Sequence, residues 1–88
     1  MVQITEAASA LLLENLVSTS VPEETGYRLA ASQGGYKLRL DRPSTEDRVV
    51  RRDGHVLLMI AQDLDEELEN IVLDVRNEDQ ERLVLETM

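Results

Sequence analysis

The sequence contains no cysteine, and this absence restricts its chemistry more than any other feature. The chain has 88 residues and contains no Cys, Phe or Trp. Its large aromatic side chains are two tyrosines. Without cysteine, these residues can form no disulfide and supply no thiolate as a nucleophile or metal ligand. Without large rings, the core must be a thin one built from interdigitated aliphatic side chains.

Basic residues are also scarce. Nine Lys and Arg residues face 18 Asp and Glu residues, which gives a formal net charge of −9. This balance argues against a nucleic-acid partner and against an anionic membrane surface. No apolar run approaches the ~20 residues of a membrane span, and the chain does not open with a secretory signal pattern. We therefore expect a soluble cytoplasmic protein with one domain over residues 1–88.

Apolar residues in the first part of the chain recur at helical spacing, which predicts a helix over residues 5–18. Thr5 can cap this helix, and Glu6 lies in the first turn, where an acid is favourable. The apolar residues form two neighbouring rows, Ala8, Leu12 and Leu16 in one, and Leu13 and Val17 in the other. A loop is expected over residues 18–26 because it contains Pro22 and Gly26.

The period then changes to two, which is typical of strands. Strands are predicted over residues 27–32 and 36–41, around 47–51, over 55–60, over 71–75 and over 82–86. Asp53-Gly54 favours a type I′ hairpin turn, and the apolar segment 55–60 indicates a central strand. Residues 62–69 suit a short helix with Leu64 and Leu68 facing inward, and a turn is expected at 77–80.

The order of these elements defines the expected fold class. It is α+β and mainly β, a compact domain with an N-terminal helix, about six short strands in a sandwich or pseudo-barrel, and a short second helix.

Four segments resemble a known family in order and spacing. They are the opening Thr5-Glu6-Ala7-Ala8, the strand, Gly34-Gly35-Tyr36, strand unit, the hairpin Asp53-Gly54-His55-Val56, and the segment Leu68-Glu69-Asn70-Ile71-Val72-Leu73-Asp74-Val75. Together they resemble the A-type (HesB-like, IscA-like) iron–sulfur cluster assembly family. The resemblance covers nearly the whole chain and implies a HesB-like domain.

The resemblance also implies that this chain lacks the family's cluster ligands. In the family a cysteine follows the paired glycine, and here Tyr36 takes that position. The family carries two further cysteines in a Cys-Gly-Cys tail, which would begin about where Thr87 and Met88 stand. Because iron–sulfur clusters are held mainly by Cys thiolates, we expect no cluster, no other cofactor and no metal. Gly34, Gly35 and Tyr36 would then form a vestigial cluster site, reused for recognition. Alternatively, the glycines serve a hairpin turn and Tyr36 packs into the sheet.

Two other segments suggest chemistry, each with a simpler alternative. The acidic run of residues 63–69 could bind a hard cation, but it lacks the ligand order of an EF-hand loop, and such runs usually form a solvated helix face. His55 is the only histidine. It could act as a general base only if a pocket joined it to Asp53 or Asp74; otherwise it is a surface residue beside a turn.

Charge is distributed unevenly along the chain. Residues 28–52 hold seven bases against three acids, whereas residues 53–88 hold two bases against eleven acids. Opposite patches could favour a homodimer or a charged partner. Alternatively, the two sets pair across the folded sheet as weak surface salt bridges.

These observations favour a protein that is not an enzyme. We expect a non-enzymatic interaction or regulatory module related to iron–sulfur assembly that binds no cluster itself, with a protein partner from that assembly. The alternative is a stand-alone domain that binds a protein or a small molecule and is unrelated to iron.

Overall fold

The computed structural model describes residues 1–77 and 81–87, so most of the predicted turn at 77–80 lies outside the described residues. The elements follow the predicted order after a short initial strand. They are β1 (Gln3–Ile4), α1 (Glu6–Thr19), β2 (Gly26–Ser32), β3 (Gly35–Asp41), β4 (Asp47–Arg52), β5 (His55–Ala61), α2 (Gln62–Glu67), β6 (Ile71–Asn77) and β7 (Glu81–Thr87).

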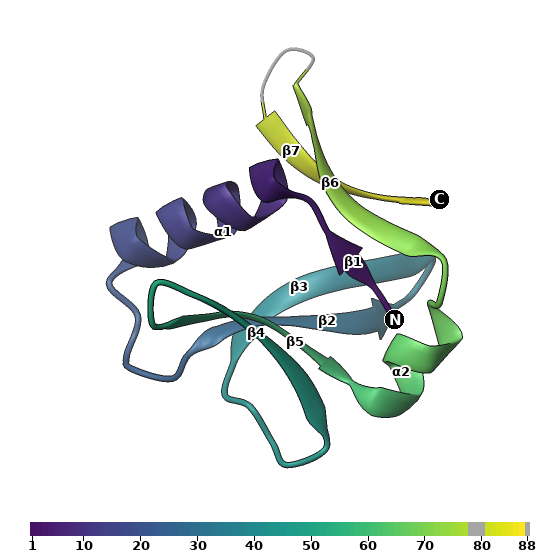
Figure 1. The fold of residues 1–88 in the computed structure, drawn as a ribbon, viewed down its shortest axis with the longest axis horizontal. Coiled ribbons are helices and arrows are strands. Elements are labelled where there is room, and N and C mark those ends of the chain that lie inside the picture. The colour runs from purple at the N-terminus through teal and green to yellow at the C-terminus, as the bar shows by residue number, and fades with distance from the viewer. Residues whose placement is uncertain (78–80, 88) are drawn as a thin grey trace.

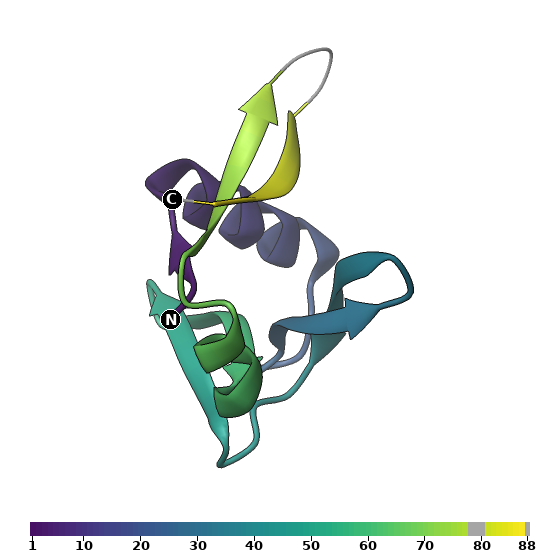
Figure 2. The same ribbon diagram turned by 90° about the vertical axis from the view of Figure 1, so that its right-hand side faces the viewer.

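The strands form two sheets. The larger has the order β3-β2-β5-β4 and the smaller the order β1-β6-β7. The pairs β2–β5 and β1–β6 are parallel, and the remaining pairs are antiparallel. Figure 1 shows α1 lying above the larger sheet, with the β6–β7 hairpin rising beside its N-terminal end. The turned view shows the β2–β3 hairpin projecting to one side (Figure 2). The predicted α+β, mainly β class is confirmed.

The strand β1 was not expected, because two residues are too few to show an alternating pattern. It forms because Gln3 and Ile4 pair in parallel with Val72 and Leu73 of β6. The first element is therefore a strand, and the predicted N-terminal helix follows it. Its effect is to fix the start of the chain to the smaller sheet.

Helix α1 begins as predicted. The Thr5 hydroxyl accepts a hydrogen bond from the Ala8 N–H at 3.2 Å and so satisfies one free amide of the first turn. The helix continues through Thr19, so Ser18 and Thr19 are helical, and the loop is shorter than expected. Ser20 ends it in the left-handed conformation, with φ of 56°.

One apolar row of α1 faces the core, and the second does so only in part. Ala8, Leu12 and Leu16 are buried, and Leu13 packs against the same cluster. Val17, the second member of that row, is 59% exposed. The helix rests on β5 and β6. Val17 lies one turn beyond Leu13, where it borders the cavity beside the loop of residues 20–25.

Strand β5 is the centre of the core, as its apolar run predicts. It pairs with β2 on one side and β4 on the other, and both helices contact it. Residues Val56 to Ile60 are consequently all buried. The turn before β5 has positive φ at both central residues, 52° at Asp53 and 78° at Gly54, which confirms the type I′ prediction.

Candidate functional site

The paired glycine lies at the tip of the β2–β3 hairpin. Ser32 pairs with Gly35, so Gln33 and Gly34 form a two-residue loop. Gly34 has φ of 82°, in the left-handed region, which a glycine in a hairpin turn can adopt without strain. An added Cβ at Gly34 would meet no atom within 4 Å. The need for glycine here therefore comes from the backbone conformation, since space is available for a side chain.

Tyr36 follows this turn and does not pack into the sheet as the alternative prediction held. Its side chain is 42% exposed, and Leu40 on the same face of β3 is 47% exposed. Leu38, between them, is half-buried. The cause is position, because β3 is the outermost strand of its sheet. The apolar face predicted for this strand exists, but it is largely open.

A groove of about 420 Å³ runs beside Tyr36, between β3 and β7. Leu29 and Leu73, which are almost completely buried, lie beneath it. One side consists of residues 36–38 of β3, and the other of residues 83–85 of β7. The groove therefore joins the edge strand of the larger sheet to an edge strand of the smaller one, and most of the residues that line it are aliphatic.

The residues of this groove do not fit an iron–sulfur cluster. The lining offers no thiol, imidazole or carboxylate, which are the side-chain groups that bind iron. Across residues 1–77 and 81–87, no group of three or more His, Asp or Glu residues is arranged to hold a metal. What the groove offers instead is aliphatic surface and a phenol.

His55 lines a second cavity, of about 350 Å³, together with the loop of residues 20–25 and the end of α1. Neither Asp53 nor Asp74 lines this cavity. Asp74 instead accepts hydrogen bonds at 2.8 Å from the Thr5 hydroxyl and the Val75 N–H. The Val75 amide, and then Thr5, hold the pKa of Asp74 below its usual range. The arrangement that would favour His55 as a general base is therefore not formed.

The strongest electrostatic contacts are structural. Arg28 donates to Asp41 at 2.7 Å and to both carboxylate oxygens of Asp47 at 2.7 and 2.8 Å. The Asp47 side chain is only 1% exposed. The Arg28 hydrogen bonds, with a further one from the Ser44 amide, lower the pKa of Asp47 to about 2. This cluster ties β2 to β3 and to β4 around the connection of residues 42–46.

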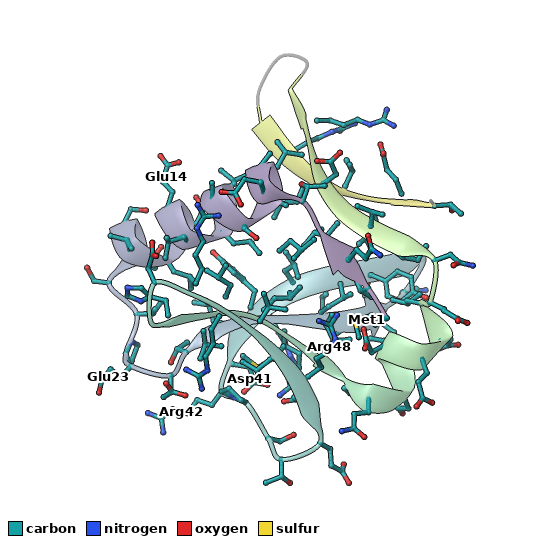
Figure 3. All side chains as sticks on the ribbon, in the orientation of Figure 1. Met1, Glu14, Glu23, Asp41, Arg42 and Arg48 are labelled. Atoms are coloured by element: carbon teal, nitrogen blue, oxygen red, sulfur yellow. The ribbon has the colours of Figure 1, made fainter. Side chains whose placement is uncertain are left out.

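A second buried ion pair joins Arg48 to Asp65, and the sequence analysis of residues 63–69 did not predict it. Asp65 is 7% exposed, whereas Asp63, Glu66, Glu67 and Glu69 are solvated as expected. Asp65 accepts from the Val2 N–H at 2.7 Å and from Arg48 at 2.9 Å. Burial acts to raise the pKa of Asp65, but Arg48 and Val2 outweigh it and hold that pKa below its usual range. Figure 3 shows Arg48 beside Met1, where it also donates to the Val2 carbonyl at 2.6 Å. The sequence pattern that could have indicated this burial is the spacing of three residues between Asp65 and Leu68, which places both on the same helical face.

The two oppositely charged segments pair with each other at only one described contact, Arg48 with Asp65. The other bases of residues 28–52 that form ion pairs do so with Asp41, Asp47, Glu24 or Glu6. The prediction that the two sets neutralise each other across the sheet is therefore wrong for most of them. Within the described residues no ion pair engages Lys37, which remains as a positive charge on β3.

No family model and no curated protein matches the chain, but solved structures share its fold. Among solved structures it is similar to the crystal structure of Escherichia coli SufA, described as involved in the biosynthesis of iron–sulfur clusters. The TM-score is 0.76 at 22% identity, over 98% of this chain and 84% of SufA. It is also similar to the crystal structure of IscA with a 2Fe–2S cluster, with a TM-score of 0.61 at 21% identity over 99% of this chain and 85% of IscA.

At this level of identity the likeness establishes the fold. That fold is the one found in SufA and IscA, and it confirms the structural expectation of the sequence resemblance. This chain differs from the pattern of the family that it resembles in having no cysteine among its 88 residues.

In the described part of the chain, neither helix has the length and apolar content that a bilayer crossing requires.

Proposed function

We propose that this protein is a non-enzymatic interaction module that acts beside iron–sulfur cluster assembly and does not itself hold a cluster. The observation that carries the proposal is the combination of an A-type fold over 98% of the chain with a complete lack of thiolates in it. Thiolates are the main protein ligands of iron–sulfur clusters.

The surface beside the paired glycine supports an interaction role. A groove of about 420 Å³ lies there, lined in part by Tyr36, Leu38 and the β7 leucines. Exposed apolar grooves of this kind favour a binding partner. The cytoplasmic location and the identity of the partner stay predictions.

Cluster binding is tested by anaerobic reconstitution with ferrous iron and sulfide, followed by gel filtration. We expect a colourless protein without thiolate-to-iron absorption, because no side chain supplies the preferred ligands. The readouts are iron and acid-labile sulfide per chain. Stoichiometric amounts of both after gel filtration would overturn the claim that this protein carries no cluster.

The link to iron–sulfur assembly needs a separate measurement. A scaffold loaded with a 2Fe–2S cluster is mixed with an apo-ferredoxin, and the transfer rate is followed by circular dichroism with and without this protein. We expect a dose-dependent change in rate, and heat-unfolded protein as the control should have no effect. An unchanged rate at a tenfold excess, for scaffolds of both the SufA and IscA types, would favour the alternative of a binding domain unrelated to iron.

A further inference from the structure

The two edge strands of the larger sheet differ in how regularly they pair. The register of β4 against β5 shifts between Val50 and Arg51, where Leu57 of β5 is left without a partner in β4. Such a bulge disrupts the ladder and increases its twist, which makes the β4 edge a poorer template for another strand. In β3, the register against β2 is continuous from Gly35 to Asp41, with no proline and no bulge. Only β3 therefore keeps a regular edge that can accept another strand.

The backbone of β3 presents hydrogen-bonding groups to this open edge. A two-residue loop closes the hairpin, so the Ser32–Gly35 pair is hydrogen-bonded, and so is every second pair after it. The N–H and C=O groups of Lys37 and Arg39 consequently face β2. Those of Tyr36, Leu38 and Leu40 point away from β2, and no described strand pairs with them.

The side chains of β3 divide by face. Leu38 pairs with Leu29 and lies on its face of the sheet, so Tyr36, Leu38 and Leu40 share that face. The groove toward β7 opens beside it. Lys37 and Arg39 lie on the opposite face. Lys37 has no ion pair among the described residues, and Arg39 reaches Asp41 only at 3.8 Å.

The different side chains on the two faces of β3 determine which kind of strand could pair with its free edge. A strand added to β3 would place every second side chain beside the apolar face and the alternate ones beside Lys37 and Arg39. Apolar residues alternating with acids fit both faces. A second copy fits poorly, because antiparallel pairing of two β3 strands about Leu38 places Lys37 opposite Arg39 of the other copy. Like charges in that position are destabilising.

The geometry points to the free edge of β3 as a strand-addition site for an extended segment of a partner protein, in which apolar and acidic residues alternate. The inference rests on the proposed function, since it gives the interaction module its surface and the chemistry of its partner. Main-chain hydrogen bonds to Tyr36, Leu38 and Leu40 supply pairing, and the groove and the two basic residues supply selectivity.

The test uses a fluorescein-labelled peptide of seven residues in which Glu and Val alternate, titrated with the full chain and followed by anisotropy. A Lys–Val peptide of the same length is the charge control. The same Glu–Val peptide with N-methylated valines removes backbone donors. We expect binding of the Glu–Val peptide at least tenfold tighter than that of either control.

Protein variants locate the contact. Lys37→Glu should weaken binding of the Glu–Val peptide at least tenfold, whereas Arg42→Glu makes the same charge change beyond the end of β3 and should change it less than threefold. Leu40→Pro removes one outward N–H without removing a bond to β2, and Leu40→Ala is its matched control. Only the proline variant should lose more than fivefold. Circular dichroism confirms that each variant is folded.

Amide hydrogen exchange gives the decisive readout. Bound peptide should slow exchange at Tyr36, Leu38 and Leu40 by at least tenfold and leave β4 unchanged. No binding at 1 mM peptide, or binding without this protection, overturns the inference. A dimer that Leu40→Pro converts to monomer in sedimentation would show that a second copy covers the edge, and would also overturn it. These outcomes leave the cluster-transfer test unaffected, so failure of the site is distinguishable from failure of the proposed function.

Discussion

The region under α1 and the region between β3 and β7 both contain many aliphatic residues, but the first is buried and the second is largely exposed. Under α1, Leu12, Leu57 and Ile60 are completely buried. Along β3, Tyr36 and Leu40 are 42% and 47% exposed. The first region has a helix to cover the sheet, and the second has no covering element among the described residues. The contrast separates apolar residues whose burial stabilises the fold from apolar residues that the fold leaves exposed.

The largest effect is expected on the closed side. Leu12→Ala should lower the free energy of unfolding by about 2–5 kcal/mol, because it leaves a cavity beneath α1. Leu40→Ala removes the same atoms from the open side and should cost less than about 1 kcal/mol. Urea denaturation of both variants checks the comparison. Equal costs would show that the two sides do not differ as described.

The Arg28 cluster should give the next largest effect, with a specific pH dependence. The pKa of Asp47 is about 2 in the folded protein, against an ordinary value of 3.8. Because the unfolded state takes up the proton first as pH falls, the contribution of Asp47 is complete above about pH 5 and is lost as pH falls toward 2. It amounts to about 2 kcal/mol.

Asp47→Asn checks this directly. At pH 7 it should be less stable than the parent by about 2 kcal/mol, and the difference should shrink toward pH 2, as measured by thermal unfolding. Glu46→Gln, at an exposed neighbouring position, is the control. A difference that stays constant from pH 7 to pH 2 would contradict the lowered pKa.

The smallest effect concerns the turn that opens β3. Gly34→Val should cost at least about 1 kcal/mol, because a β-branched residue is strained at a φ of 82°. Gln33→Val places the same side chain at the neighbouring loop position, which has no positive φ, and should be nearly neutral. If both valine variants unfold at the same urea concentration, the paired glycine is not a constrained turn.

The sequence predicted those parts of the fold in which local pattern and burial agree. The helical spacing of Ala8, Leu12 and Leu16, the Asp53-Gly54 turn and the apolar run of β5 each identify one structure, and the structure contains all three. Val17 shares a row with Leu13 but is exposed, because an apolar side chain at a helix margin is buried only if a neighbouring element reaches it. Strand β1 was missed because pairing with β6 defines it, and no local pattern does.

The candidate site was predictable in place but not in form. The Gly34-Gly35-Tyr36 motif located the hairpin, yet the exposure of Tyr36 depends on β3 being an edge strand and on β7 lying opposite. Both depend on how the strands are ordered in the two sheets, which the local sequence pattern does not show. Asp65 is a similar case, because its burial depends on Val2 and Arg48, which are 63 and 17 residues away in the sequence. Charge counting along the chain cannot identify such partners.

The central proposal is that a chain with the fold of SufA and IscA carries no cluster because it lacks the thiolate ligands, and restoring those ligands tests it most directly. Three proteins are reconstituted anaerobically with iron and sulfide, and both are measured per chain after gel filtration. They are the parent, Tyr36→Cys, and Tyr36→Cys with Cys-Gly-Cys added after Met88. We expect stable loading only in the third, because one thiolate per chain leaves most of the iron coordination to water or oxygen ligands. Equal and stable loading of the parent would contradict the account.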